Sequence, residues 1–589
     1  MQRNENVLNN MFGSFFLATV ISALMTRLGG FTDSIIVSHL VSPDALSVVR
    51  IWQPVAGVMF IIIGLMTSGA SFLSARGIGA QNYDKVNRVF NNHLYYVIFS
   101  TLLVLGLILP FLDNVANILT TDERLLPMLK PYIHADLFAL FVAAVCGVPI
   151  SYVITNGSPQ LITRRIIISQ ILNVIFDLLL CGVFDLGMAG ASLASGLSNL
   201  LAFTSLIGYM RKNDRIFRLH RPEKICSIKQ YRECLVIGLP MFLSSLLAPA
   251  MSFTMNSLVV NKLGADGMYI FTVYFQINGI CMLALSGSNN AISNIGGILL
   301  GEEDYDSFRL LTRRILRKML SIMAVVSLFI FIFPDLLARL FGADDALIEQ
   351  CHIPLRLMSL AFLPNALSET LNVLYFVQGH HKLSRWIEIV TNVGTIAIIA
   401  LMAIFTPEFL WYVLPVTAWL LLIVMLAMAY ALHRKNPLFS WPTLENTVPS
   451  NPAVTFSVPY TTQSVQDFLN QIRPFIEACE LKDGIAVDIA LEELLYEIVE
   501  TNPDRKENET FDVRIIDQEN SFRIVLKSQG PLRNPIYKYS DEELLNMDEN
   551  NIRGAVLSRV CKNITHKYMN GINCIYLNYD RTMPADFND

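Results

Sequence analysis

Residues 172–198, LNVIFDLLLCGVFDLGMAGASLASGLS, contain the features that decide the fold. Two apolar runs flank a short Gly-containing turn, and Asn173 and Asp177 lie four residues apart in the first run. Residues with this spacing share one face of a helix. A charged side chain in the middle of a membrane helix costs about 2.5–3.5 kcal/mol on insertion scales, so its presence calls for a functional reason. The segment therefore predicts two consecutive membrane helices, the first of which carries a functional carboxylate.

The composition of the whole chain supports a membrane protein. Of its 589 residues, 53% are hydrophobic and 16% are charged, whereas soluble domains are about 25% charged. A membrane-spanning helix needs about 20 mostly apolar residues. Twelve segments meet this requirement, at about 11–38, 51–76, 92–119, 131–155, 163–183, 187–210, 233–261, 268–299, 317–341, 353–377, 386–405 and 408–432.

The sequence thus predicts an all-α polytopic membrane protein with twelve transmembrane helices in two six-helix lobes, followed by a soluble α+β C-terminal domain. The expected boundaries are 1–222 for the first lobe, 223–435 for the second, 436–455 for a linker and 456–589 for the C-terminal domain.

The distribution of charge predicts the orientation in the membrane. Most Lys and Arg residues between the spans fall in alternate loops, including the loop at 211–232. Basic loops stay in the cytoplasm, so we expect a plasma (inner) membrane protein with both termini cytoplasmic. The N-terminus, MQRNENVLNN, does not resemble a cleaved signal peptide. The nine Cys residues show no CxxC spacing, which argues against a disulfide framework or a structural zinc site.

Two pairs of similar segments indicate an internal repeat. SHLVSPDALSVV (from Ser38) is similar to NKLGADGMYIFTV (from Asn261), and GAQNYDKVNRVF (from Gly79) is similar to GEEDYDSFRLLT (from Gly301). Both pairs are separated by nearly the same number of residues. A parallel repeat of six spans is typical of a two-lobed transporter, whose substrate site lies between the lobes near the middle of the membrane.

Polar residues in the spans of the first lobe predict a cation site. Asp33 lies in the first span, Asn173 and Asp177 lie in the fifth, and Ser195 in the sixth is a weaker fourth candidate. Carboxylate and amide oxygens suit Na⁺, and two carboxyl groups buried side by side can also retain a proton. We therefore expect a coupling site for H⁺ or Na⁺, with no other metal and no organic cofactor.

An alternative interpretation gives these acids a structural role. Arg27 lies in the same span as Asp33 and could pair with it, which would leave Asp177 to stabilise the helix bundle. Two further acids, Glu369 and Glu388, are interpreted as packing or interfacial groups rather than ligands.

The residues of the membrane part resemble the multidrug and toxic compound extrusion (MATE) family. The resemblance runs in order over about 1–435 and is closest in the segment from Leu172. FTDSIIVSHLVSPDAL (from Phe31) resembles the end of the family's first span, and IGLPMFLSSLL (from Ile237) resembles the start of its seventh.

This resemblance implies a secondary transporter, not an enzyme, that exports organic cations and other amphiphilic compounds against inward H⁺ or Na⁺. Asp33, Asn173 and Asp177 match the family's first-lobe cation site. The second-lobe acids of some members are absent, because Ala248 and Lys382 stand at the corresponding positions. Two alternatives remain: a flippase for lipids or lipid-linked saccharides, which requires a strongly cationic cavity, and a membrane-anchored signalling protein.

The C-terminal domain resembles a degenerate histidine-kinase-like ATPase of the anti-sigma-factor serine kinase type. Three motifs carry the resemblance: IALEELLYEIVE (489–500), KSQGPLRNP (527–535) and NIRGAVLSRV (551–560). Glu497 replaces a Mg²⁺-binding Asn, Ser528 replaces the adenine-binding Asp, and only Gly554 remains of a glycine-rich lid. We expect a regulatory domain that binds a cytoplasmic protein, with weak nucleotide sensing as the alternative. Small amphiphilic substrates and membrane lipid are the other expected partners, and nucleic acid is not.

Overall fold

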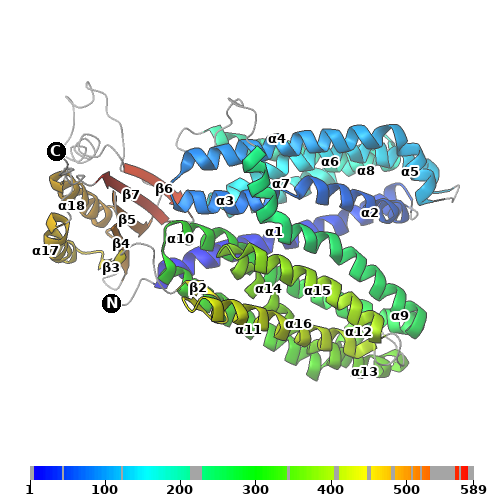
Figure 1. Cartoon of the computed structure of the whole chain (residues 1–589). Helices are drawn as coiled ribbons and strands as arrows, with labels where there is room; N and C mark the ends of the chain where they lie inside the picture. Colours follow the sequence, from blue (N-terminus) through cyan, green and yellow to red (C-terminus); the bar gives the residue numbers. More distant parts are fainter. Residues whose placement is uncertain are drawn as a thin grey trace. The chain divides into compact units, whose positions relative to one another are not determined.

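The computed structural model contains two compact units, one of residues Phe15–Thr447 and one of Met1–Ser14 together with Val448–Asp589. Figure 1 shows their helices and strands. The structure describes residues 5–42, 45–120, 124–211, 228–340, 345–402, 410–446, 453–478, 484–505, 509–517, 521–530, 564–569 and 572–580.

The unit Phe15–Thr447 is built from helices of two lobes. The first lobe consists of α1 (Glu5–Leu40), α2 (Ala45–Gly64), α3 (Thr67–Gly79), α4 (Tyr83–Ile108), a short 3-10 turn η1 (Leu109–Phe111), α5 (Leu112–Leu119), α6 (Leu126–Thr155), α7 (Pro159–Asp177), a π-helical segment η2 (Leu178–Val183) and α8 (Gly187–Arg211). The second lobe consists of α9 (Ile228–Ala291), a π-helical segment η3 (Ile292–Gly296), α10 (Gly297–Gly301), α11 (Tyr305–Ile332), α12 (Pro334–Leu340), α13 (Asp345–Ser359), α14 (Phe362–Val377), α15 (His381–Met402) and α16 (Leu410–Lys435).

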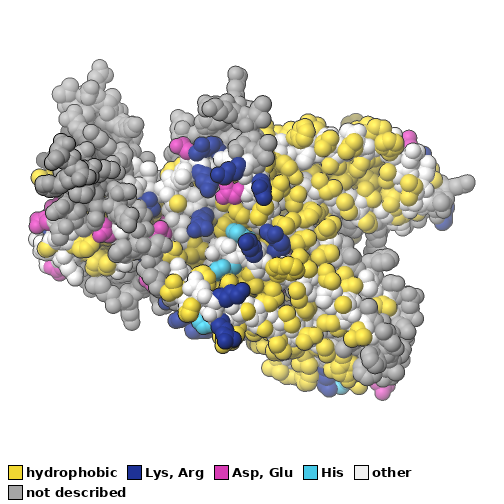
Figure 2. Space-filling view, in the orientation of Figure 1, with side chains coloured by type: hydrophobic (Ala, Val, Ile, Leu, Met, Phe, Trp, Pro, Cys, Tyr) yellow, Lys and Arg dark blue, Asp and Glu magenta, His cyan; other side chains and the backbone are white. Residues whose placement is uncertain are grey.

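Nine helical segments of the described part of the chain are long and apolar enough to cross a membrane. Their outer surfaces carry large exposed hydrophobic side chains, among them Phe99, Leu107, Val325, Leu328 and Ile423. Figure 2 shows these hydrophobic surfaces, with Lys and Arg side chains gathered toward one end of the unit. Lipid is the solvent that such a surface requires, so the expected multi-pass membrane fold is confirmed at this level.

The helix α9 covers the expected seventh and eighth spans in one continuous stretch of 64 residues. A straight helix of that length would measure about 96 Å, three times the hydrocarbon core of a bilayer. Gly69 on α3 lies against Cys234 near the start of α9, and Gly79 on α3 lies against Ile298 just beyond its end. Because α3 is short, both ends of α9 lie on the same side of the unit, and α9 reverses direction between them.

The two copies of the repeated loop have the same local conformation. Asn82 and Asp304 cap the helices that follow, each with φ −86° and ψ 68°. The side chain of each accepts a backbone N–H three residues later at 3.1 Å. Such a cap satisfies a backbone donor that the first turn of a helix leaves free. The repeat therefore extends from the sequence to the backbone geometry.

The lobes touch each other through these repeated loops. Gly79 ends α3 and Gly301 ends α10, and a Cβ atom at Gly301 would lie 2.9 Å from the Cα of Gly79 and 2.2 Å from the carbonyl oxygen of Arg76. Only glycine permits so close an approach of two backbones. At the opposite end the lobes diverge (Figures 1 and 2).

Part of the expected linker forms a small hairpin that belongs to the membrane unit. β1 (Phe439–Ser440) pairs antiparallel with β2 (Glu445–Asn446) directly after α16. The Arg309 side chain of α11 pairs with the buried Glu445 at 3.1 Å, and the Tyr375 hydroxyl of α14 donates to the carbonyl of Pro442 at 2.8 Å. The hairpin thus joins the ends of three second-lobe helices.

The other unit contains the α+β domain. Its sheet has the order β3-β4-β5-β7-β6 and is antiparallel throughout. Helices α17 and α18 contribute to a core with one face of the sheet, including Leu469, Leu491, Phe511 and Leu577. The elements are β3 (Ala453–Pro459), α17 (Thr462–Ala478), α18 (Gly484–Glu500), β4 (Thr510–Asp517), β5 (Ser521–Gln529), β6 (Ile564–Met569) and β7 (Ile572–Asp580).

Candidate functional site

The carboxyl groups of Asp33 and Asp177 face each other across the contact between α1 and α7. The two side chains are close neighbours there. Asp177 is fully buried, and neither of its oxygens accepts a hydrogen bond from a donor of another described residue. Two ionised carboxylates only accept hydrogen bonds, so they cannot satisfy one another. The pair therefore requires a shared proton or a bound cation.

The backbone changes its winding directly after Asp177. The π-helical segment η2 (Leu178–Val183) follows it, and the N–H of Phe184 bonds the carbonyl of Leu179 at 2.8 Å. Single π-turns within helices are frequent at functional sites. Here the wider turn ends the straight part of α7 at the acidic residue.

Asn173 and Ser195 complete the predicted set. The Asn173 side chain, one turn before Asp177 on α7, donates to the Ser195 hydroxyl of α8 at 3.4 Å. Ser195 and Asp33 both line a small cavity with a volume of about 50 Å³. The structure therefore brings together the four residues on which the predicted cation site depends.

Sequence reasoning missed three further polar residues at this cavity, namely Tyr132 and Asp136 of α6 and Ser192 of α8. The Asp136 carboxylate accepts from the Trp52 indole at 2.6 Å and from the Ser192 hydroxyl at 2.9 Å. The sequence does contain a signal for Asp136, because it is an acidic residue within an apolar span. The free-energy cost of placing a charge in the membrane, which identified Asp177, applies to it equally.

Arg27 does not pair with Asp33. Its guanidinium group packs against the backbone of Gly279 on α9, and Asp33 Oδ1 has no hydrogen-bond partner within the described part of the chain. The alternative in which Arg27 neutralises Asp33 therefore finds no support, because the two side chains are directed to different neighbours.

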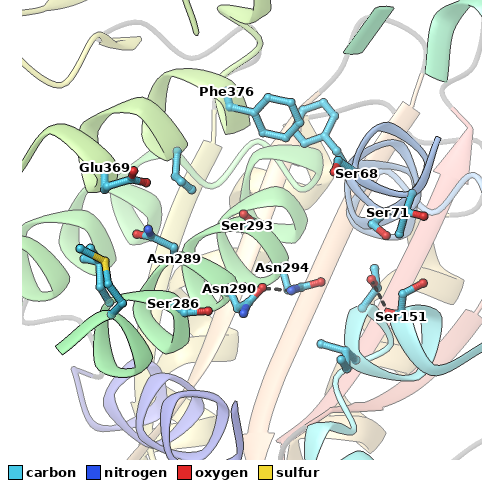
Figure 3. A pocket seen from close by; sticks show the side chains of 17 residues that line it. Ser68, Ser71, Ser151, Ser286, Asn289, Asn290, Ser293, Asn294, Glu369 and Phe376 are labelled. Carbon is cyan, nitrogen blue, oxygen red and sulfur yellow. Dashed lines mark hydrogen bonds between the residues drawn. The ribbon is translucent and has the colours of Figure 1, made fainter. Parts of the chain in front are cut away.

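A larger cavity of about 550 Å³ lies between the two lobes. The first lobe contributes hydroxyl side chains, among them Ser68, Ser71 and Ser151, and the second lobe contributes amides such as Asn290 and Asn294. Figure 3 shows these groups facing one another from α3 and α6 on one side and from α9 and η3 on the other. Ligand pockets for drug-sized molecules measure about 300–1,000 Å³, so this cavity can hold an organic substrate and the smaller one cannot.

Glu369 of α14 is the charged residue among the described side chains that line this cavity (Figure 3). Its side chain is exposed to this cavity, whereas the sequence alone favours a packing or interfacial role for Glu369. Glu388 is instead buried and accepts a hydrogen bond from the Asn372 amide at 2.6 Å, as a packing group would. Sequence alone does not show which face of α14 borders the space between the lobes.

No three His, Cys, Asp or Glu side chains converge into a metal site anywhere in the described ranges. A site for a multivalent metal ion would need such a cluster. The acids of the first lobe are instead arranged as a pair, Asp33 with Asp177, and a separate carboxylate, Asp136.

Comparison with known proteins gives a consistent result for the membrane part. The MatE family model matches residues 18–179 and 240–402. The multidrug export protein MepA of Staphylococcus aureus (strain bovine RF122 / ET3-1) is 28% identical over 251 residues, which make up 42% of this chain and 54% of that protein. MepA of Staphylococcus haemolyticus (strain JCSC1435) is 25% identical over 263 residues, or 44% of this chain and 57% of that protein. The match spans about half the length of these curated relatives.

Solved structures share the fold. A structure described as the outward-facing conformation of a multidrug resistance MATE family transporter of the MOP superfamily has a TM-score of 0.65 and 18% identity, covering 74% of this chain and 99% of that one. A MOP superfamily transporter from Pyrococcus furiosus Vc1 (DSM3638), described as having a binding pocket of reverse polarity, has a TM-score of 0.64 and 18% identity, covering 74% and 98%. At this identity the similarity establishes the architecture.

Proposed function

This chain belongs to the MatE family, and from that premise we propose that it is a secondary antiporter, not an enzyme. It carries organic cations or other amphiphilic compounds out of the cell while H⁺ or Na⁺ flows inward. The observation that supports this best is the presence of two separate polar cavities in one membrane unit. One is sized for an ion and contains Asp33, and the other is sized for an organic molecule and contains Glu369.

The chemistry of each cavity fits its proposed role. Asp33 and Asp177, with Asn173 and Ser195 beside them, bind H⁺ or Na⁺, because this buried acid pair lacks a positive partner among the described residues. Glu369 supplies one negative charge, and the surrounding hydroxyl and amide groups supply hydrogen bonds, which suits a monovalent organic cation.

The contact between the lobes supports alternating access. The lobes meet at Gly79 and Gly301 and diverge at the other end, so the cavity between them lies on the path that rocking of the lobes would open and close. We infer twelve membrane crossings, with α9 supplying two. The end at which the lobes meet is the cytoplasmic one, because the basic side chains gather near it.

A flippase with a strongly cationic cavity is not favoured. The described side chains of the cavity between the lobes include Glu369 and no Lys or Arg. A protein whose spans only anchor a signalling domain would not need two polar cavities with unpaired acids.

Ion-gradient-driven transport tests this function. The full chain is reconstituted into liposomes, and uptake of a fluorescent lipophilic cation, ethidium, is followed under an imposed H⁺ or Na⁺ gradient. Uptake that follows one gradient supports the antiporter and identifies the ion. Uptake of ethidium that is independent of either gradient would contradict it.

A Glu369→Gln variant should bind organic cations about tenfold more weakly, a loss of about 1.4 kcal/mol, because it removes the negative charge of the cavity. Binding of ethidium to the purified protein, measured by fluorescence anisotropy, checks this. Glu349→Gln, which changes an exposed acid of α13, is the matched control and should bind like the wild type. Equal affinities of all three proteins for ethidium would show that Glu369 does not contribute to binding of the cation.

For the C-terminal domain, we propose a histidine-kinase-like ATPase fold that has lost its nucleotide site and binds a cytoplasmic protein instead. The order of its helices and strands along the chain supports the resemblance, although Gly554 lies outside the described residues. Ser528 is buried, and Gly530 is packed against Asn502 and accepts a hydrogen bond from the Tyr568 hydroxyl at 3.1 Å. A serine hydroxyl at this position lacks the second oxygen and the charge with which a carboxylate holds adenine.

The full chain is therefore expected to bind ATP no better than background. Titration with trinitrophenyl-ATP, followed by its fluorescence and by competition with unlabelled ATP, measures this. Binding that ATP displaces, and that Ser528→Ala weakens, would instead support nucleotide sensing.

A further inference from the structure

The carboxylate of Asp136 has no role in the scheme above, although it lies in the same small cavity as Asp33. Asp136 and Tyr132 are one helical turn apart on α6, and both line this cavity of about 50 Å³. The residues that face Asp136 come from α1, α2, α6 and α8. Those among the lining residues that can titrate are Asp33 and Tyr132.

The two hydrogen bonds of Asp136 fix the carboxylate but leave its charge in place. Both partners, the Trp52 indole and the Ser192 hydroxyl, are neutral donors, and each engages one oxygen. An ionised carboxylate can accept about four hydrogen bonds, so about two acceptor positions remain. No described Lys, Arg or His forms an ion pair with Asp136. A half-buried carboxylate that lacks a basic partner is stabilised by a cation from the medium.

The size of the cavity limits what that cation can be. A volume of about 50 Å³ has room for only a few water-sized species. The three acids do not converge, as the absence of a metal cluster among the described residues shows. A monovalent ion passing between two positions fits this arrangement, and a multivalent metal ion does not.

The cavity lies toward the end of the first lobe that is opposite the contact between the lobes. Its lining includes Ala45 and Val49 from the first turns of α2. The α2–α3 span ends at Gly79, where the lobes meet. Ala45 is therefore at the opposite end, which is the extracellular end in the proposed orientation.

We propose that Asp136 is a second binding station for the coupling cation, in the same small cavity as Asp33 of the Asp33–Asp177 pair. This inference rests on the proposed antiporter function. If the ion is a proton, one O–H bond forms at Asp136 and breaks again as the proton moves to the pair. If the ion is Na⁺, only its coordination by oxygen atoms changes. The fixed hydrogen bonds to Trp52 and Ser192 keep the station in place in both cases.

Trp52 provides a reporter for this station. Its indole donates directly to Asp136, so occupation of Asp136 by a cation alters the environment of the indole. The other four Trp residues lie in the second lobe or its hairpin, at 386, 411, 419 and 441. Tryptophan fluorescence of the purified full chain is measured in two titrations, one of pH without Na⁺ and one of Na⁺ at constant pH.

We expect a cation-dependent change in fluorescence that disappears in Trp52→Phe and in Asp136→Asn. A change in the pH titration identifies H⁺ as the ion that binds, and a change in the Na⁺ titration identifies Na⁺. Asp113→Asn is the matched control, because Asp113 is an exposed acid of α5 paired with Lys130, and it should retain the full change. Ser192→Ala keeps the carboxylate but removes one hydrogen bond, so it should keep the change and shift its midpoint.

The outcomes separate this inference from the proposed function. Asp33→Asn should keep the Trp52 signal while it loses gradient-driven transport, and Asp136→Asn should lose both. A wild-type protein without a Trp52-dependent response, or an Asp136→Asn variant that keeps it, overturns the inference but not the antiporter. Normal gradient-driven transport by Asp33→Asn would contradict the antiporter scheme itself. If Asp136→Asn does not fold, an unshifted midpoint in Ser192→Ala overturns the inference.

Discussion

An Asp33→Asn variant is expected to lose gradient-driven transport while it remains folded in the membrane. Asparagine keeps the size of the side chain but cannot carry the charge that binds H⁺ or Na⁺ beside the buried Asp177. Couplings between two binding sites amount to about 1–3 kcal/mol, so accumulation of substrate should fall by about five- to 150-fold, to the level of liposomes without an ion gradient. Uptake of ethidium by proteoliposomes measures this.

The same sequence motif supplies a matched control for this variant. Asp185 lies eight residues after Asp177, is exposed and has a φ of 50°. Asn tolerates that left-handed conformation well, so Asp185→Asn changes an equivalent charge without strain. It should transport like the wild type. An Asp33→Asn protein that still accumulates ethidium along an ion gradient would exclude Asp33 from coupling.

The residues of this first-lobe site could be predicted because acidic side chains are rare in apolar membrane spans and are therefore easily identified in the sequence. Asp33 and Asp177 stood out in apolar spans, and helical periodicity placed Asn173 on the same face as Asp177. The opposing arrangement of Asp33 and Asp177 depends on how α1 packs on α7, which no local pattern contains. The contact of Arg27 with Gly279 is likewise set by packing between α1 and α9.

The second-lobe side of the substrate cavity was not predictable in the same way. Glu369 and Glu388 are similar by sequence, since both are acids in or near apolar spans. In the structure one borders the space between the lobes, and the other is buried against Asn372. Which face of α14 borders that space follows from the tertiary arrangement of two lobes, not from the composition of one helix.

The internal repeat could be predicted from the sequence. The contact that its two copies form between the lobes could not. The similarity of the loops from Gly79 and Gly301 gave equivalent positions in the two lobes. The structure adds that these equivalent glycines lie against each other. A repeat thus identifies symmetric residues, and only the packing of the lobes shows that they meet.

The contact between Gly79 and Gly301 should hold the lobes closed at the end where they meet. A Gly301→Ala variant should weaken closure of the lobes at the end where they meet, and transport should fall at least tenfold. Its Cβ would lie 2.2 Å from the carbonyl oxygen of Arg76 and 2.9 Å from the Cα of Gly79, and neither backbone atom can rotate away. Overpacking of this kind costs about 1–3 kcal/mol or more, and each 1.4 kcal/mol changes the ratio of closed to open states tenfold.

The accessibility of the cavity between the lobes reports this shift. A Ser71→Cys substitution places a thiol in that cavity, whereas Cys234 and the other Cys residues of the described membrane segments are buried. In inside-out vesicles a membrane-impermeant maleimide should label Ser71→Cys faster when Gly301→Ala is also present. Gly106→Ala is the control, because no atom lies within 4 Å of its new Cβ, and it should leave the rate unchanged. Equal labelling rates with Gly301→Ala would mean that the glycine contact does not hold the lobes closed, and that another contact between them determines access to the substrate cavity.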